Sequence, residues 1–252
     1  MTRSEYVLEA EDLTKQFRGF YAVNGVNLKV RRGSIHALIG PNGAGKTTVF
    51  NLVTKFLEPT SGRIAYDGED ITRTGPAAIA RKGMVRSFQI SAVFAHLSVL
   101  ENVRVALQRP TGLTYQFWRS ERVLESLNDR AHELLDAVGL SDATDMTAGE
   151  LPYGRKRSLE IATTLALDPT LMLLDEPTAG MAHEDVNRVT ALIRNVSKNR
   201  TVLLVEHNLG VVADLSDTIT VLQRGEVLVE GDYDTVANDP EVREAYMGVG
   251  HD

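Results

Sequence analysis

The stretch Gly40-Pro41-Asn42-Gly43-Ala44-Gly45-Lys46-Thr47-Thr48 fits the phosphate-loop pattern: a glycine, any four residues, a glycine, a lysine, then serine or threonine. Glycines let the backbone turn tightly around a phosphate, because no Cβ stands in the way. The freed N–H groups then point at the oxygens, and the following helix N-terminus adds positive potential. We expect this whole stretch to bind a nucleotide, with Lys46 reaching the terminal phosphates and the Thr47 hydroxyl ligating Mg²⁺.

The residues on either side of the loop fit this role. Residues 35–39 are apolar enough for a short buried strand leading in, and residues 48–57 predict a helix leading out. The alternative is a glycine-rich turn that precedes Lys-Thr by chance, but such a turn would not require a buried strand before it and a helix after it. The sequence therefore predicts a nucleotide-binding protein.

The composition narrows the class of protein. The chain has 252 residues, long enough for one large domain or for a domain with an inserted lobe. Its net charge of −7 gives no support to bulk nucleic-acid binding, and the absence of cysteine excludes disulfides and thiolate metal sites. No uncharged apolar run approaches the roughly 18 to 20 residues of a membrane span, and no signal segment follows residues 1–5. We therefore expect a cytosolic protein.

The hydrophobic pattern along the chain changes from strand-like to helical at about residue 91. Residues 5–39 predict strands with turns at Asn24-Gly25 and Arg32-Gly33, and further strands are expected at 62–66 and 84–88. From about residue 91 the pattern is helical: Ser98 and Glu101 form a capping box, and apolar residues at three- and four-residue steps mark a helix ending near Gly139. We predict an α-helical lobe at residues 91–162, inserted in a core formed by residues 1–90 and 163–252.

The core resumes at residues 171–174, an apolar run suited to a strand buried on both faces. A helix at 184–197, strands at 201–205, 219–222 and 227–230, and two short final helices are expected. Strands that alternate with helices around a phosphate loop imply a mainly parallel sheet. The predicted fold class is α/β, with an antiparallel β part at the N-terminus.

Acidic residues follow the strand at 171–174. A carboxylate at the end of a strand beside a phosphate loop is where such enzymes hold Mg²⁺, directly or through water, which suits Asp175. Glu176 is then placed to take a proton from an attacking water. Adjacent acids at a strand end are also common in solvated turns, but Lys46 upstream favours the functional interpretation. The strand at 202–205 ends similarly, and we expect His207 to face the γ-phosphate.

Four stretches in this order resemble the ATP-binding subunits of ABC transporters. They are residues 40–48 (Walker A), Ser87-Phe88-Gln89 (Q-loop), Leu151-Pro152-Tyr153-Gly154-Arg155 (signature) and residues 171–176 (Walker B). His207 matches the switch histidine, and Ala179-Gly180-Met181 lies where that family has its D-loop. The ATP-binding proteins of branched-chain amino acid importers are most similar, although importers of urea, amides and lipopolysaccharide share much of the pattern.

The resemblance implies a P-loop NTPase (RecA-like) core and hydrolysis of ATP with Mg²⁺. The implied catalytic residues are Lys46, Gln89, Glu176 and His207. The implied Mg²⁺ ligands are Thr47, Gln89 and Asp175. Phe17 would stack on the adenine unless it is a core phenylalanine, and Gly154 of a second subunit would face the ATP. The residues of the phosphate loop would bind the phosphates.

The resemblance also implies partners and a location. It implies a second ABC ATPase subunit (identical or different), transmembrane permease subunits, an indirect periplasmic substrate-binding protein, and no nucleic acid. The protein would lie on the inner face of the cell membrane. A rival class is the soluble ABC-type ATPase of DNA repair or translation, which usually carries tandem cassettes, long coiled coils or zinc modules. A GTPase would need a guanine-reading Asn-Lys-x-Asp, which the sequence lacks.

The signature departs from the usual Leu-Ser-Gly-Gly-Gln, since only Leu151 and Gly154 match. Pro152 removes the hydroxyl that the family points at the opposite γ-phosphate. Proline nevertheless suits the first turn of a helix, whose N–H groups and dipole still favour an anion. The sequence leaves open whether residues 155–157 (Arg-Lys-Arg) add charge there or form a solvated basic face, and whether Trp118 packs in the lobe or touches a partner.

Overall fold

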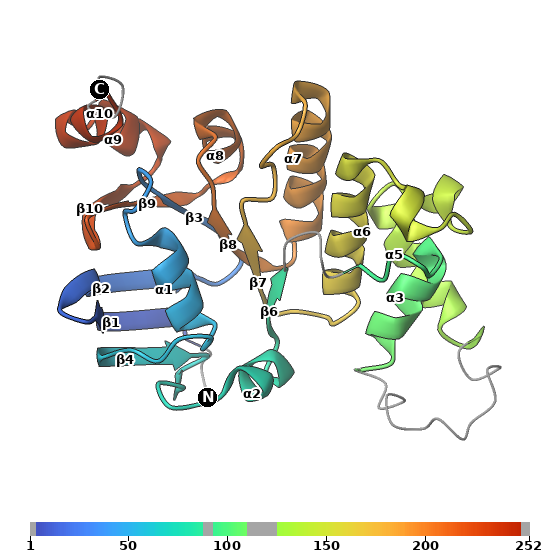
Figure 1. The fold of residues 1–252 in the computed structure, drawn as a ribbon, viewed down its shortest axis with the longest axis horizontal. Helices are drawn as coiled ribbons and strands as arrows, with labels where there is room; N and C mark the ends of the chain where they lie inside the picture. The colour runs from blue at the N-terminus through green and yellow to red at the C-terminus, as the bar shows by residue number, and fades with distance from the viewer. Residues whose placement is uncertain (1–3, 88–92, 110–124, 248–252) are drawn as a thin grey trace.

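The computed structural model describes residues 4–87, 93–109 and 125–247 and contains two β-sheets with helices around them (Figure 1). The N-terminal sheet is antiparallel and has the order β2-β1-β4-β5. Its strands are β1 (Tyr6–Phe17), β2 (Phe20–Arg31), β4 (Ser61–Tyr66) and β5 (Glu69–Asp70). The predicted antiparallel β part at the N-terminus is confirmed.

The β1–β2 hairpin turns at Arg18-Gly19, where φ is 47° and 93°, the positive pair that a type I′ turn requires. The predicted turn at Asn24-Gly25 is wrong, because both residues lie inside β2. There the register shifts between the pairs Leu13–Val26 and Lys15–Val23, and Gly25 has φ 64°. Asn-Gly therefore supplies a β-bulge here, since a bulge can use the same positive φ as a turn.

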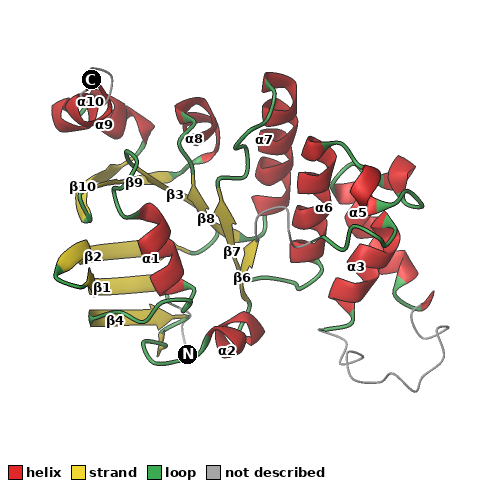
Figure 2. Ribbon diagram, in the orientation of Figure 1, coloured by secondary structure: helices red, strands yellow, loops and turns green. Residues whose placement is uncertain are grey.

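The larger sheet has the order β10-β9-β3-β8-β7-β6, and all its neighbours are parallel except β9 and β10 (Figure 2). Every residue of β3, β7 and β8 is buried, as expected for central parallel strands. This confirms the mainly parallel α/β fold. The strands are β3 (Ile35–Ile39), β6 (Met84–Ser87), β7 (Leu171–Asp175), β8 (Thr201–Val205), β9 (Thr218–Gln223) and β10 (Glu226–Gly231).

Helix α1, which follows the phosphate loop, is shorter than predicted. It begins at Lys46 and ends at Val53, because Lys55 adopts a left-handed φ of 63° that stops the helix. The other helices named below are α2 (Pro76–Arg81), α3 (Val99–Leu107), α5 (Asn128–Ala137), α6 (Tyr153–Leu165), α7 (His183–Ser197), α8 (Leu209–Leu215), α9 (Tyr233–Asn238) and α10 (Pro240–Met247). Among the described residues, no helix has the length and apolar character needed to cross a membrane.

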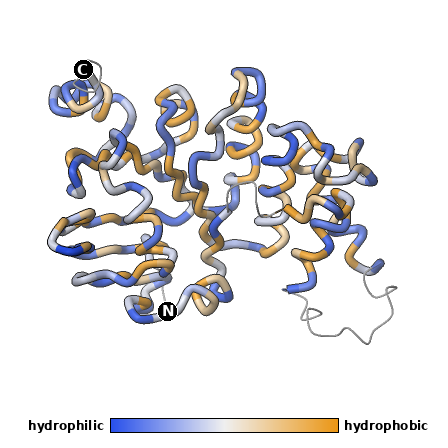
Figure 3. The backbone as a smooth tube through the Cα atoms, in the orientation of Figure 1, coloured by the Kyte–Doolittle hydropathy of each residue, from blue (hydrophilic) through white to orange (hydrophobic). Residues whose placement is uncertain are grey.

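Helices α3, α5 and α6 stand together beside the β6 edge of the sheet (Figure 1). The capping box of α3 is confirmed: Ser98 Oγ accepts from Glu101 N–H at 3.1 Å, and Glu101 Oε2 accepts from Ser98 N–H at 2.7 Å. One apolar core joins these helices to α7 and to one face of β7 and β8, and the apolar run of the central strands is visible in Figure 3. The division into a core and a lobe at residues 91–162 stays a prediction; α6 continues past that boundary.

Candidate functional site

The phosphate loop connects the C-terminal end of β3 to α1 and is shaped by glycines. Gly40 has φ 147°, and a Cβ there would lie 2.2 Å from the carbonyl oxygen of Leu222. Gly45 has φ 104°, and its Cβ would lie 2.6 Å from the carbonyl oxygen of Ala22. Gly43 has φ 79° in open space, so it is needed for its conformation alone.

Hydrogen bonds from distant segments hold this loop. Ala44 N–H donates to the Pro41 carbonyl at 3.1 Å, and the Ala44 carbonyl accepts from Gly225 N–H at 3.0 Å. The Gly225 carbonyl in turn accepts from Asn24 N–H at 2.8 Å, which connects the loop to β2. The cradle is therefore preformed, while the side chains of Asn42 and Thr47 are exposed and that of Thr48 is half-buried.

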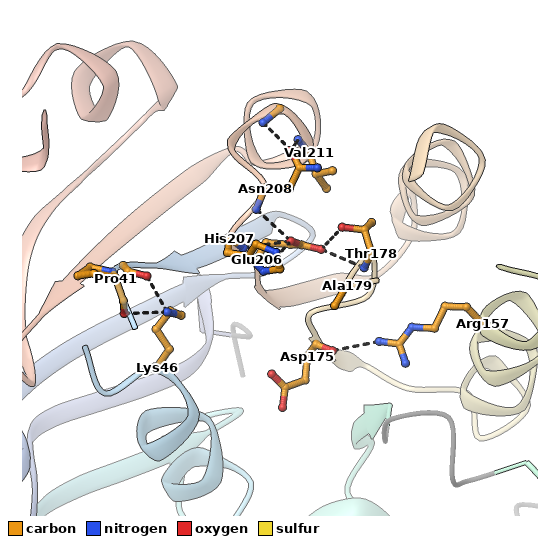
Figure 4. A network of polar contacts seen from close by, with 12 residues as sticks. Pro41, Lys46, Arg157, Asp175, Thr178, Ala179, Glu206, His207, Asn208 and Val211 are labelled. Atoms are coloured by element: carbon orange, nitrogen blue, oxygen red, sulfur yellow. Dashed lines mark hydrogen bonds and ion pairs between the residues drawn. The ribbon is translucent and has the colours of Figure 1, made fainter. Parts of the chain in front are cut away.

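Lys46 opens α1 and is 8% exposed. Its Nζ donates to the carbonyl oxygens of Gly40 at 2.6 Å and Pro41 at 3.1 Å, inside the loop (Figure 4). Burial lowers the pKa of Lys46, and the charges of Glu176 and then Asp175 oppose that shift. The structure thus brings the lysine and the two predicted acids into electrostatic contact.

Asp175 is the last residue of β7 and is 8% exposed. Its Oδ2 accepts from Arg86 Nη2 on β6 at 2.6 Å, and Arg86 Nη1 donates to Asn51 Oδ1 at 2.6 Å. The Arg86 guanidinium lies 4.8 Å from the centre of the Phe50 ring. No role is predicted for this arginine from the sequence, although it directly precedes the predicted Q-loop.

Glu176 has φ 44°, which is uncommon for a residue other than glycine. Its N–H donates to the Val205 carbonyl at 2.9 Å, and its own carbonyl accepts from Ala179 N–H at 3.1 Å. Such a backbone persists only where its surroundings fix it, and it is frequent at functional sites. The half-buried Glu176 side chain therefore starts from a defined position at the sheet edge.

A third acid, Glu206, is completely buried beside His207. Its carboxylate accepts from Thr178 N–H and Oγ1 at 3.1 and 2.6 Å, and from the N–H groups of His207 and Asn208 at 3.0 and 3.2 Å (Figure 4). These bonds join the ends of β7 and β8. His207 is 58% exposed, with Nδ1 4.0 Å from Glu206 Oε2. No role is predicted for Glu206 from the sequence; its position directly before the histidine was the available signal.

The three basic residues after Gly154 differ in burial, and only Arg157 is fully buried. Arg157 is 4% exposed, pairs with Glu160 and donates to the Asp175 carbonyl oxygen at 3.1 Å. Lys156 donates to the Gly149 carbonyl at 2.8 Å, and Arg155 pairs with Asp142. The solvated alternative is therefore wrong for Arg157.

The remaining predicted site residues lie apart from this edge or outside the described chain. Phe17 ends β1 and is 43% exposed, so it is not a core phenylalanine, and Lys15 Nζ lies 5.2 Å from its ring centre. Gly154 lies buried in the first turn of α6, where a Cβ would come within 2.8 Å of the Asp185 carboxylate. Gln89, with Phe88, and Trp118 lie outside the described residues.

The oxygen donors near the loop are of the kind Mg²⁺ prefers: the Thr47 hydroxyl and the Asp175 carboxylate. Within residues 4–87, 93–109 and 125–247, no group of three or more histidine, cysteine or acidic side chains could hold a metal alone.

A glycine-lined loop between a buried strand and a helix, facing acids at the ends of β7 and β8, defines a P-loop nucleotide-binding protein. The family model described as "ABC transporter" matches residues 23–179. The chain belongs to this family. A second family model, "Branched-chain amino acid ATP-binding cassette transporter", matches residues 226–252.

Similar proteins cover the whole chain. The high-affinity branched-chain amino acid transport ATP-binding protein BraF of Pseudomonas aeruginosa is 41% identical over 97% of this chain and 99% of its own length. The corresponding LivG of Escherichia coli K12 is 39% identical with the same coverage. A crystal structure of the ADP conformation of an ATP-binding cassette of an ABC transporter matches with a TM-score of 0.84 and 31% identity, over 97% of this chain and 100% of that one.

Proposed function

We propose that this chain is the ATP-hydrolysing subunit of an importer and couples ATP hydrolysis to uptake of branched-chain amino acids. The observation that carries the hydrolytic part is the placement of Lys46 opposite Asp175 and Glu176 at one edge of a parallel sheet. Within the family to which the chain belongs, this placement supports an attack of water on the γ-phosphate.

Each residue of the site has a role that follows from its position. Backbone N–H groups of the loop, at residues after Pro41, cradle the phosphates, and Lys46 turns from the carbonyls of Gly40 and Pro41 toward them. Thr47 and Asp175 would hold Mg²⁺, which neutralises phosphate charge when bound. Glu176 takes the proton of the attacking water, and His207 faces the γ-phosphate. Catalysis is mainly electrostatic placement.

The relatives support branched-chain amino acids as the transported solute. BraF and LivG carry that transport function in their names, and the second family model, which covers residues 226–252, is specific to it by description. This favours the assignment over urea, amides or lipopolysaccharide. It also favours an importer over a soluble ATPase of DNA repair or translation.

The implied partners are a second ABC subunit, permease subunits in the membrane and, through them, a periplasmic substrate-binding protein. The chain would lie at the inner, cytoplasmic face of the membrane. In the dimer, Gly154 and the first turn of α6 would face the partner's ATP. The α6 N-terminus, with Pro152 as its N-cap residue, favours an anion there.

A groove of about 820 Å³ separates α2 and β6 from α3 and α6. Phe56 and Val105 line it and are 51% and 38% exposed, and Arg81 and Arg109 give it positive charge. Its apolar and basic lining fits a permease segment with apolar and acidic side chains. We place the permease contact at this groove.

Phosphate release from Mg-ATP by the purified chain tests the hydrolytic part directly. Co-expression with the permeases encoded beside it, followed by uptake of radiolabelled leucine into proteoliposomes, tests the transport part. We expect release that depends on Mg²⁺ and uptake that depends on ATP. A chain that binds ATP without releasing phosphate would overturn the proposal.

A further inference from the structure

A buried ion pair on α6 connects the groove to the acids of the site. Arg157 and Glu160 lie three residues apart on α6 and are 4% and 2% exposed. Arg157 donates to the Asp175 carbonyl oxygen at 3.1 Å, while Glu160 lines the groove. Two side chains therefore span the distance between the groove and the residue that precedes Glu176.

Glu160 has an unsatisfied oxygen. One carboxylate oxygen, Oε2, pairs with Arg157, but Oε1 is buried without a hydrogen-bond partner among the described residues. Burial raises the pKa of Glu160, and the adjacent Arg157 opposes this shift. A buried carboxylate oxygen without a donor is costly, so a donor supplied from outside the chain would bind it favourably.

The groove reaches Asp175 by a second route. Arg86 also lines the groove, and it donates to the Asp175 carboxylate at 2.6 Å. Arg157 holds the carbonyl of the same residue. Asp175 is thus fixed from both its backbone and its side chain by two arginines, of which Arg86 lines the groove and Arg157 pairs with Glu160, which lines it. A displacement of Glu160 moves Arg157, and with it the backbone that positions Glu176.

We propose that Glu160 and Arg157 are positioning residues that transmit occupancy of the groove to Asp175 and Glu176. The Glu160 Oε1 atom accepts a hydrogen bond from an N–H or O–H donor of the permease segment in the groove. This inference rests on the proposed function, because the occupant is the permease. It adds a named path from that contact to the catalytic edge.

The chain itself supplies the matched control. Arg130 and Glu133 form an ion pair with the same three-residue spacing on α5, but they are 51% and 64% exposed. Glu160→Gln and Glu133→Gln each remove one charge and keep the side-chain shape. Because the protein has no cysteine, Val105→Cys also gives a single site in the groove for a fluorescent label.

The steady-state kcat and KM for Mg-ATP are measured first in the isolated chain. We expect Glu160→Gln to lower kcat about tenfold with little change in KM, because it disturbs the Walker B end and leaves the phosphate loop intact. When the label at Val105→Cys is combined with Glu160→Gln, its fluorescence change on addition of Mg-ATP should be smaller than with Glu160 in place. In the complex with the permeases, the stimulation of ATPase activity should be lost. Glu133→Gln should alter none of these.

Equal kcat and equal stimulation in Glu160→Gln and Glu133→Gln would overturn the inference. If Glu160→Gln does not fold, the double variant Arg157→Met/Glu160→Leu replaces the pair by apolar groups, a change that buried ion pairs often tolerate. It should show the same losses, and wild-type kcat and stimulation in it would also refute the path. Absence of phosphate release by the wild type would instead refute the proposed function.

Discussion

The phosphate loop is built from backbone, whereas the edge opposite it is built from side chains. In the loop, carbonyl oxygens of Leu222 and Ala22 fill the space where Gly40 and Gly45 have no Cβ. At the acidic edge (Asp175, Glu176 and Glu206), Arg86 on β6 and Thr178 donate to the carboxylates of Asp175 and Glu206, and Arg157 on α6 donates to the Asp175 carbonyl oxygen. Backbone atoms of distant segments therefore limit the loop at individual glycines, while the acidic edge depends on polar and charged side chains.

The largest effect is expected from Glu176→Gln at the acidic edge. Phosphate release should fall about 10²- to 10⁴-fold, because an amide takes no proton from water. ATP binding should persist, because the loop is unchanged, and size-exclusion chromatography should show a stable ATP-bound dimer. Glu133→Gln is the control, and near-normal turnover of Glu176→Gln would remove the glutamate from the role of base.

Two glycines of the loop give the next contrast. Gly40→Ala should weaken Mg-ATP binding by at least about tenfold, because its Cβ meets a carbonyl oxygen and the loop must shift. The Cβ of Gly43→Ala meets no atom within 4 Å. This variant should destabilise the loop only by the strain of the left-handed backbone, about 1 kcal/mol. Titration with Mg-ATP compares the two, and equal losses would contradict a loop fixed by close backbone contacts.

Glu206→Gln tests how far the acidic edge depends on its buried carboxylate. The amide nitrogen that replaces one carboxylate oxygen cannot accept a hydrogen bond, so either the two Thr178 donors or the N–H groups of His207 and Asn208 lose their acceptor. We expect a loss of about 3 kcal/mol in the free energy of unfolding. Urea denaturation measures it. Glu184→Gln, at an exposed position in α7, is the control. A similar stability of both variants would mean that the four hydrogen bonds do not hold the strand ends together.

The sequence revealed the loop and not the supports of the acidic edge, for a physical reason. A phosphate loop is a local pattern, so its residues and its flanking strand could be predicted from neighbouring letters. Arg86 and Arg157 reach Asp175 only because the chain folds, and their partners lie 89 and 18 residues away. A local pattern can also serve two structures: in Asn24-Gly25 the glycine has the positive φ of a turn, but the pair forms a bulge inside β2.

The strand beneath the loop should make stability depend on pH. Burial lowers the pKa of His36 on β3 from 6.5 to about 4, with a backbone hydrogen bond to Lys29 opposing it. In the unfolded chain this histidine therefore binds a proton below pH 6.5, whereas in the folded chain it is protonated only below about pH 4. The contribution is complete above pH 6.5 and is lost as the pH falls toward 4.

Between pH 7 and pH 5 this loss should be about 2 kcal/mol in the free energy of unfolding. Urea denaturation of the wild type and of His36→Gln at both pH values isolates the effect of this histidine. The variant keeps a polar group near Thr220, whose hydroxyl lies 2.7 Å from His36 Nε2. An identical pH dependence in both proteins would assign the acid sensitivity to other groups.

The smallest effect is expected where the signature meets the D-loop. Tyr153 donates its hydroxyl to the Ala179 carbonyl at 3.0 Å, so the first turn of α6 is joined to the turn that follows Glu176. Tyr153→Phe should lower the free energy of unfolding by about 1 kcal/mol, because it removes one partly exposed hydrogen bond and keeps the ring. If that bond couples the two segments, ATP-dependent dimerisation of Glu176→Gln should weaken by about fivefold when Tyr153→Phe is added. Tyr233→Phe, at an exposed position in α9, should leave it unchanged. Dimerisation as strong as in Glu176→Gln alone would show that signature and D-loop act separately.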